Sequence, residues 1–273
     1  MERIRRALVA REFVLYYQPQ VNLRTGAVIG AEALVRWQHP KRGLLLPQEF
    51  LPAIEDDLLA VELGEWVIET ALTQMDSWRA SGLGLPVSVN VGTRQLRQAD
   101  FVARLRALLA AHPGVKPSSL ALEILETSAM QDLAQVARIF AECRALGVGC
   151  ALDDFGIGYS SLTCLKRLAV TALKIDRSFV GHMLDNPDDL AIVDSILGLA
   201  TAFRCQAVAE GVETLAQGER LRQLGCELAQ GFSIAHPLPA RELPGWLAAW
   251  RPSPPTEATH AGLQVSAKTC VPP

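Results

Sequence analysis

The sequence predicts an α/β fold, specifically a modified TIM-like (β/α)8 barrel with one antiparallel strand near the N-terminus. The chain has 273 residues, close to the roughly 250 that a single α/β barrel needs. Short apolar runs alternate with longer segments of helical period, which is the pattern of repeated βα units around a parallel sheet. Residues 23–26 join the first two predicted strands and are too few for a crossover helix, so these strands are expected to form an antiparallel hairpin.

The expected elements follow from this alternation. Strands are predicted at residues 13–21, 27–36, 86–91, 119–125, 148–153, 170–176, 204–210 and 225–231. Helices are predicted at residues 2–11, 61–80, 94–111 and 187–203, and also along the apolar stripe from Leu133 to Leu146. An open doubly wound sheet remains the structural alternative. Residues 1–251 are expected to form one domain, and the proline-punctuated residues 252–273 a disordered tail.

Composition and charge exclude some classes of protein. Apolar residues make up 49% of the chain, enough for a large core, and the formal charge of -3 gives no electrostatic footprint for polymeric nucleic acid or an anionic membrane. The six cysteines are scattered without a Cys-x-x-Cys pair, as in the core of a reduced cytosolic protein. Because no long apolar stretch or signal-peptide core occurs, the chain is expected to be cytoplasmic, with no membrane segment of its own. Its abrupt start is typical of a domain cut from a longer protein.

Polar residues recur near the carboxyl ends of the predicted strands, the rim that carries the chemistry of α/β barrels. The two-residue period of a strand puts Glu32 and Arg36 on one face and turns Asn90 away from its valine neighbours. Further strands finish in Glu123, in Lys174 with Asp176, in Glu210 and in Gln230. A single acidic residue in such a place is more often a helix cap or a solvated loop residue. It is the recurrence of acidic residues at the ends of several strands that indicates a functional site.

The adjacent pair Asp153-Asp154 is the strongest candidate for a divalent-metal site. Neighbours in a regular strand point to opposite faces, so both carboxylates can serve one site only if the strand ends there. Gly156 and Gly158 follow, and glycines permit such a turn and a flexible loop over the site.

Carboxylates that converge on one rim would repel one another and raise one another's proton affinity unless cations were bound. The acids concerned are Glu32, Glu123, Asp153, Asp154 and Glu210. Two divalent cations together with Lys174 would balance their charge. Because the ligands are oxygens, Mg²⁺ or Mn²⁺ fits better than Zn²⁺. Asp153 could bridge two metals about 4 Å apart, the arrangement that activates water for displacement at phosphorus. The residues therefore predict phosphate-ester chemistry.

Several segments together resemble the EAL family of cyclic di-GMP phosphodiesterases. Glu32-Ala33-Leu34, followed by Val35-Arg36-Trp37, matches the family signature. Other matching segments stand in the family's order: Tyr17-Gln18-Pro19, Val89-Asn90-Val91, Glu123-Ile124-Leu125-Glu126, Asp153-Asp154-Phe155-Gly156, Leu173-Lys174-Ile175-Asp176, Glu210-Gly211-Val212-Glu213-Thr214 and Gln230-Gly231-Phe232. The resemblance covers residues 12–245. It implies a barrel with one antiparallel strand and hydrolysis of cyclic di-GMP to linear pGpG.

The resemblance also implies a role for each matching residue. One metal would be held by Glu32, Asn90, Glu123 and Asp153, and the second by Asp153, Asp154 and Glu210. Lys174 would position the attacking water. The substrate-binding residues would be Gln18, Leu34, Arg36 and Gln230. Gln18 would lie near a guanine, Arg36 would meet a phosphate, and Gln230 would also support the metal ligands. Ca²⁺ is expected to inhibit.

Regulation and function follow from the same resemblance. Glu126 would anchor the loop of residues 155–161, which links the metal site to a homodimer interface in this family. Departures from the family pattern lie outside the presumed ligands, at Leu58, Leu125, Ile157 and Ala169. The main prediction is an active phosphodiesterase, the output domain of a larger bacterial signalling protein. The alternatives are a catalytically weak cyclic di-GMP receptor or partner-binding module, and a barrel acting on another phosphodiester.

Overall fold

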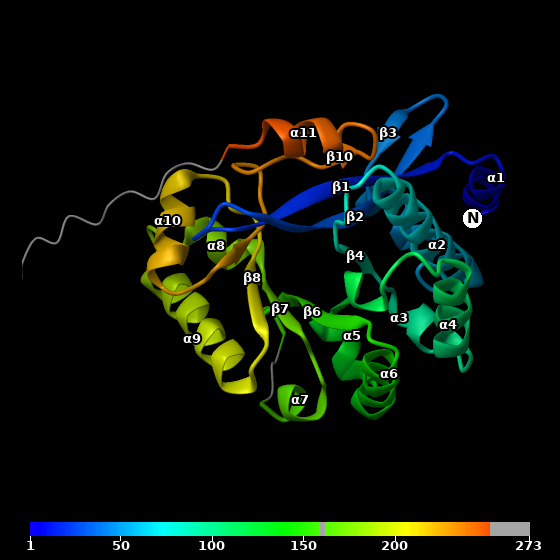
Figure 1. Cartoon of the computed structure of the whole chain (residues 1–273). Helices are drawn as coiled ribbons and strands as arrows, with labels where there is room; N and C mark the ends of the chain where they lie inside the picture. Colours follow the sequence, from blue (N-terminus) through cyan, green and yellow to red (C-terminus); the bar gives the residue numbers. More distant parts are fainter. Residues whose placement is uncertain (159–161, 252–273) are drawn as a thin grey trace, which may run out of the picture.

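The computed structural model describes residues 1–158 and 162–251, which form a strand barrel with helices on its outside (Figure 1). All described strands belong to one sheet, in the order β10-β1-β9-β8-β7-β6-β5-β4-β2-β3. Their bounds are β1 (Phe13–Asn22), β2 (Val28–His39), β3 (Gly43–Leu45), β4 (Val87–Asn90), β5 (Leu120–Leu125), β6 (Gly149–Phe155), β7 (Ala172–Ile175), β8 (Gln206–Ala209), β9 (Leu228–Ala229) and β10 (Leu238–Pro239).

An additional pairing between β1 and β2 closes this sheet into a ring. Within the described residues the ring contains eight strands, β1, β2 and β4 to β9. β1 is antiparallel to both of its ring neighbours, β2 and β9, whereas the remaining ring neighbours are parallel. The predicted barrel with one antiparallel strand near the N-terminus is confirmed, and the open doubly wound alternative is wrong.

Helices follow most of the ring strands and cover their outer face. Their bounds are α1 (Glu2–Val9), α2 (Leu58–Ala80), α3 (Thr93–Leu96), α4 (Phe101–Ala111), α5 (Glu126–Gln131), α6 (Leu133–Ala145), α7 (Leu162–Arg167), α8 (Arg177–His182), α9 (Pro187–Phe203), α10 (Leu215–Gln223) and α11 (Leu243–Ala249). None of the helices among the described residues combines the length and the apolar character needed to cross a membrane.

Side chains alternate between the two faces of the ring strands. In β5, Leu120, Leu122 and Ile124 are at most 1% exposed and belong to the main apolar core between ring and helices. Ala121 and Glu123 lie between them and therefore face the inside of the ring. The same alternation in the other strands gathers charged and polar side chains within the barrel.

The segment predicted as one helix at residues 94–111 forms two helices, α3 and α4. Leu96 and Phe101 both lie in the main core. Five residues apart, they would point about 140° from each other on one continuous α-helix. The break between α3 and α4 lets both side chains reach the core, a tertiary demand that the local period does not show.

Two short strands, β3 and β10, are absent from the predictions. β3 pairs with β2, and β10 pairs with β1. They contain three and two residues, too few for a two-residue alternation to appear in the sequence. The strand predicted at residues 225–231 is shorter in the structure, where β9 contains two residues.

The cysteines of the described residues are free thiols, as predicted. Four of them are buried and Cys205 is partly exposed; the buried ones are Cys143, Cys150, Cys164 and Cys226. Cys270 and the predicted tail at residues 252–273 lie outside the described residues.

Candidate metal centre

Lys174 stands among four carboxylates inside the barrel. Its Nζ atom lies 2.7 Å from Glu123 Oε2, 2.7 Å from Glu210 Oε1, 3.1 Å from Asp153 Oδ1 and 3.3 Å from Glu32 Oε2. Lys174 is 2% exposed, and weak solvent screening strengthens such contacts. An ammonium buried without partners would be costly, so the lysine and the carboxylates stabilise one another.

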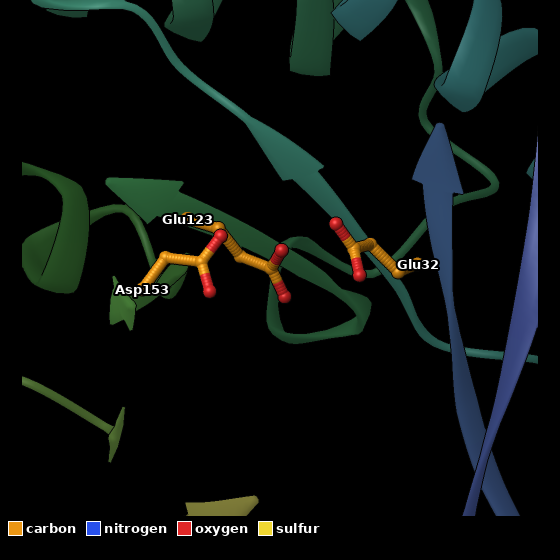
Figure 2. Close-up of side chains that lie close together, drawn as sticks. All are labelled: Glu32, Glu123 and Asp153. Carbon is orange, nitrogen blue, oxygen red and sulfur yellow. The ribbon is translucent and has the colours of Figure 1, made fainter. Parts of the chain in front are cut away.

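Each of these groups is supplied by a different part of the ring. Glu32 lies in β2, Glu123 in β5, Asp153 in β6 and Lys174 in β7, while Glu210 directly follows β8. Because parallel strands of a barrel present equivalent positions at one end, these side chains meet. Figure 2 shows the carboxylates of Glu32, Glu123 and Asp153 pointing toward one another. The strand-end acids found in the sequence are thus brought together.

The carboxylate oxygens form two overlapping groups, and within each group the ligand atoms all lie within 4.8 Å of one another. The first group is Glu32, Glu123 and Asp153, and the second is Asp153, Asp154 and Glu210. Asp153 belongs to both. Asn90 adjoins the first group, because its Nδ2 donates to Glu32 Oε1 at 2.7 Å. Rotation of this amide would present its oxygen instead.

The pair Asp153-Asp154 reaches one site through a local distortion of β6. The sequence predicts that the strand ends at this pair, but β6 continues through Phe155. Its pairing with β7 shifts register between Leu152 and Phe155, and Asp154 adopts a left-handed backbone with φ of 51°. Such a bulge re-aims a side chain without ending the strand, and Asp tolerates this conformation better than most residues. The predicted strand end is wrong, although both carboxylates still serve one site.

Gln230, just after β9, orients Glu32 through a chain of buried amides. Its Nε2 donates to Glu32 Oε2 at 2.7 Å and to Gln18 Oε1 at 2.9 Å. Its Oε1 accepts from Gln20 Nε2 at 2.9 Å, while Gln18 Nε2 donates to the Ala235 carbonyl at 3.0 Å. Gln20 is a residue that the sequence interpretation missed. The signal for it was its place two residues beyond Gln18, on the same face of β1.

Arg36 and Leu34 share the inward face of β2 with Glu32. Arg36 is buried, its Nη1 donates to the Val35 carbonyl at 2.9 Å, and its guanidinium carbon lies 5.9 Å from the centroid of the Tyr16 ring. Burial lowers the pKa of Arg36, and the charge of Glu32 partly offsets that decrease. Leu34 is half-buried. A cation and an apolar side chain therefore stand beside the carboxylates.

Burial raises the pKa of most carboxyl groups in the centre, whereas for Glu32 the effect of burial is outweighed by the charge of Lys174 and by hydrogen bonds from Gln230 and Asn90, which lower the pKa. Burial raises the pKa of Glu210 to about 8 and that of Asp154 to about 6. Burial, reinforced by the charge of Glu32, also raises the pKa of Glu123 well above its ordinary value. For Lys174 burial acts to lower the pKa, but the carboxylates around it raise the pKa well above the ordinary value. Without added cations, the centre therefore retains protons as well as the ammonium.

The donor set suits hard divalent cations. Both groups consist of carboxylate oxygens, and an amide stands beside the first. Oxygen ligands of this kind favour Mg²⁺ or Mn²⁺ over softer metals. The ammonium of Lys174 already occupies the point where four carboxylates need positive charge. The two carboxylate groups, which share Asp153, therefore fit hard divalent cations.

Asp176 supports the centre from behind Asp154. The sequence places it on one face with Lys174 but assigns it no function. It is 5% exposed, and its Oδ1 accepts from the backbone N–H of Ser178 at 2.8 Å at the start of α8. Its carboxyl group also hydrogen-bonds with that of Asp154, which contributes to the raised pKa of Asp154. The sequence does not distinguish this contact with Asp154 from the ordinary role of an aspartate as a helix cap.

Glu126 connects α5 to the segment after β6. It is 1% exposed, and its Oε2 accepts from the backbone N–H of Gly156 at 3.0 Å. A Cβ added at Gly158 would lie 3.2 Å from Glu126 Cδ, so the carboxylate packs against this segment. Part of the predicted loop, residues 159–161, lies outside the described residues.

The departures from the family pattern are not themselves carboxylates of the metal centre. Leu58, Leu125 and Ile157 are 56%, 42% and 58% exposed, and Ala169 is half-buried. Leu125 pairs in register with Asp153 and directly precedes Glu126.

The chain is similar to known proteins along most of its length. The EAL domain family model matches residues 1–237. The bifunctional diguanylate cyclase/cyclic di-GMP phosphodiesterase MucR of Pseudomonas aeruginosa is 44% identical over 241 residues, 88% of this chain and 35% of that protein. The cyclic di-GMP phosphodiesterase PA2567 of the same organism is 36% identical over 86% of this chain and 40% of that protein. The chain thus spans between 35% and 40% of the length of these two relatives.

Solved structures give the same result. The PaMucR phosphodiesterase in complex with c-di-GMP has a TM-score of 0.85 at 44% identity, covering 89% of this chain and 98% of that one. The EAL domain of Mycobacterium smegmatis DcpA has a TM-score of 0.73 at 38% identity, covering 86% of this chain and 96% of that one. The matched family model, the identity to these relatives and the shared barrel agree with the motifs in the sequence, and the chain belongs to the EAL domain family.

Proposed function

We propose that this chain is a two-metal phosphodiesterase that hydrolyses cyclic di-GMP to linear 5′-pGpG. The observation that carries the proposal is the pair of carboxylate groups that share Asp153 and adjoin the buried ammonium of Lys174. Membership of the EAL domain family and the activities of MucR and PA2567 support the choice of substrate.

The first cation would be held by Glu32, Asn90, Glu123 and Asp153, and the second by Asp153, Asp154 and Glu210. When bound, two Mg²⁺ or Mn²⁺ ions supply charge stabilisation to the attacking and leaving oxygens at phosphorus. Ca²⁺ prefers longer and less regular coordination by the same oxygens, so it is expected to occupy the centre and inhibit.

Lys174 would hold the attacking water. Its ammonium has three donors. Two of them meet Glu123 and Glu210 at 2.7 Å, and the third would turn from Asp153 and Glu32 to the water once those carboxylates hold cations. Gln230 would keep Glu32 in its ligand orientation through their 2.7 Å hydrogen bond. Catalysis of this kind depends on holding reacting groups within a few tenths of an ångström, which buried hydrogen bonds achieve.

Substrate contacts would come from the residues beside the centre. The guanidinium of Arg36 can bind a phosphate through two parallel hydrogen bonds, and Leu34 offers apolar surface on the same face of β2. Gln18 uses one donor and one acceptor of its amide within the protein. One further donor and one further acceptor therefore remain for the edge of a guanine.

The cellular setting is part of the proposal. The domain would act in the cytoplasm as a homodimer and as the output module of a larger signalling protein. The share of MucR and PA2567 that the chain spans supports a modular arrangement. The hydrogen bond from Gly156 to Glu126 supports a link between the metal centre and α5.

The test is to incubate the protein with cyclic di-GMP and Mg²⁺ or Mn²⁺ and to follow pGpG by chromatography. We expect product in either metal, none after chelation, and none from Glu32→Ala. Glu69→Ala, an exposed acid on α2, is the matched control and should retain full activity. Tight binding of cyclic di-GMP without product in any metal would instead favour a receptor.

A further inference from the structure

The inside of the barrel has a second layer beneath the charged one, and it consists of small side chains. Two residues before Glu32, Asn90, Glu123, Asp153 and Lys174, the inward positions hold Gly30, Ser88, Ala121, Ala151 and Ala172, respectively. In α/β barrels these layers are ordinarily filled by bulky branched residues. Five neighbouring strands therefore leave the lower half of this barrel unfilled.

A cavity of about 1040 Å³ includes this space and extends beyond the ring to residues of α9 such as Leu197 and Thr201. All five small residues line it, and Glu123 and Lys174 form its inner end. The lining continues to residues that precede the strands, such as Pro86, Ser119 and Thr171, so the cavity opens at the amino ends of the strands. We call it the floor cavity. Ala121 and Ala172 are partly exposed although they lie in central strands, which agrees with access from that end.

The floor cavity is separate from the rim where the metal centre opens. Among the described residues, Arg36, Asp154 and Glu210 stand at the rim, and none of them lines the floor cavity. Glu123 and Lys174 are the side chains that both places share. The ion pair between Glu123 and Lys174 lies between the floor cavity and the metal centre.

The floor cavity offers uncharged polar groups inside the barrel, while its charged lining residues besides Glu123 and Lys174 are Arg144, Asp194 and Glu227. Ser88 is 6% exposed, and its Oγ has no hydrogen-bond partner among the described residues. Gln20, whose amide nitrogen donates to Gln230, lines the cavity together with Gln206 near the mouth. The charges of Lys174 and Glu123 at the inner end satisfy each other at 2.7 Å.

These features define a class of ligand. Aliphatic walls, such as Ile29, Val208 and Leu228, with a few hydrogen-bonding groups are typical of small-molecule sites, whose volumes are about 300–1,000 Å³. We propose that the floor cavity is a second binding site, for small neutral molecules that carry hydroxyl or amide groups, and that its occupant acts on the metal centre from below. This proposal goes beyond phosphodiester hydrolysis and does not depend on turnover.

The coupling follows from the shared side chains. Glu123 belongs to the first carboxylate group, and Lys174 contacts carboxylates of both groups. A molecule that presses on either side chain from the floor cavity changes the position of metal ligands. Its occupancy should therefore alter metal affinity without contact with the rim.

Access is tested with Ala172→Cys and a neutral hydroxyl-bearing reagent, 2-hydroxyethyl methanethiosulfonate. The cysteine thiolate attacks the divalent sulfur that carries the hydroxyethyl group, the bond from this sulfur to the sulfonyl group breaks, and a mixed disulfide and methanesulfinate result. Peptide mass spectrometry separates this site from Cys205 and Cys226, which also line the cavity. The matched control is Ala71→Cys, at a position on α2 that is 0% exposed in the main core.

We expect Ala172→Cys to react at least a hundredfold faster than Ala71→Cys, in a reaction that saturating cyclic di-GMP with Ca²⁺ does not abolish. Equal rates for the two variants, or complete protection of Ala172→Cys by cyclic di-GMP, would overturn the proposal. The labelling needs no catalysis, so an inactive phosphodiesterase would leave this result interpretable.

Reversible binding and coupling are tested separately. Saturation-transfer NMR with 1,2-hexanediol as the probe should give a signal with the unmodified protein and a weaker one with Ala121→Leu/Ala172→Leu, whose added side chains narrow the inner part of the cavity. Calorimetry should show that labelled Ala172→Cys binds Mn²⁺ at least tenfold more weakly than the unlabelled variant, with recovery after reduction. No signal with the unmodified protein, or unchanged Mn²⁺ affinity after labelling, would contradict the proposal.

Discussion

Lys174 Nζ lies 2.7 Å from Glu123 Oε2, and each of these side chains is 2% exposed. The contact is one of four that the ammonium makes with carboxylates of the candidate metal centre. Charges buried together in this way depend on one another, because removal of one partner leaves the other uncompensated. The lysine and the carboxylates therefore act as one electrostatic unit.

Lys174→Met should destabilise the protein in chelator and abolish turnover. The substitution keeps most of the side-chain volume but leaves four carboxylates without the ammonium, a loss of about 3 kcal/mol in the free energy of unfolding. Mn²⁺ should restore more stability to this variant than to the unmodified protein, because cations replace the missing charge. Denaturant unfolding with and without Mn²⁺ measures both effects. Lys166→Met, at an exposed position on α7, is the control, and an equal loss in the two variants would contradict the electrostatic account.

Gln230→Ala should weaken metal binding while the barrel stays folded. Without the amide that donates to Glu32 Oε2, this carboxylate loses one of the partners that orient it, and loss of such partners typically reduces metal affinity by about 10-fold to 100-fold. Calorimetric titration with Mn²⁺ measures the change. Gln223→Ala, at an exposed position of α10, should bind Mn²⁺ normally. Unchanged affinity in Gln230→Ala would show that Glu32 does not need this hydrogen bond.

Asp154 offers a way to separate backbone strain from function. Its φ of 51° is easily adopted by glycine but costs about 1 kcal/mol for a residue with a Cβ. Asp154→Gly and Asp154→Ala both remove the carboxylate and should both lose turnover by more than about 100-fold. In chelator, however, the glycine variant should be the more stable by about 1 kcal/mol. An alanine variant as stable as the glycine variant would argue against a strained bulge.

Metal affinity should increase with pH between about 6 and 8. Glu210 has its pKa raised from 4.5 to about 8 and Asp154 from 3.8 to about 6, so cations must displace protons that the folded protein holds. The same shifts mean that the metal-free protein loses stability from these groups as pH increases through this window, because the folded state binds more protons than the unfolded chain.

Calorimetry with Mn²⁺ in buffers of different ionisation enthalpy measures the protons released. We expect apparent affinity to rise by about tenfold per pH unit for each proton displaced. Glu210→Gln should bind more weakly and show a flatter dependence between pH 7 and pH 8, roughly the range below the raised pKa of Glu210. Binding without proton release at any pH in the window would contradict this picture.

Much of the fold and of the centre could be predicted because the governing patterns are local. The period of two places Glu123 opposite Leu122 and Ile124, and the short link before β2 requires a hairpin. Acids at successive strand ends must then meet at one end of a closed barrel. The bulge at Asp154 could not be predicted, because its left-handed backbone arises where β6 and β7 change register, which is a property of two strands together.

Other features depend on contacts distant in sequence. The break between α3 and α4 serves the simultaneous burial of Leu96 and Phe101. Gln20 shares a face of β1 with Gln18, but the hydrogen bond that defines its role joins it to Gln230, 210 residues away. The floor cavity is a sum of small residues from several strands, and each of them alone is unremarkable in the sequence.

The central claim is that two cations share Asp153 in this centre and that hydrolysis of cyclic di-GMP depends on both. Anomalous diffraction from crystals soaked in Mn²⁺ tests it most directly, with turnover measured on the same protein. We expect two peaks about 4 Å apart, one among Glu32, Asn90, Glu123 and Asp153 and the other among Asp153, Asp154 and Glu210. A single peak, or none at these residues, in protein that converts cyclic di-GMP to pGpG with Mn²⁺ would contradict the claim.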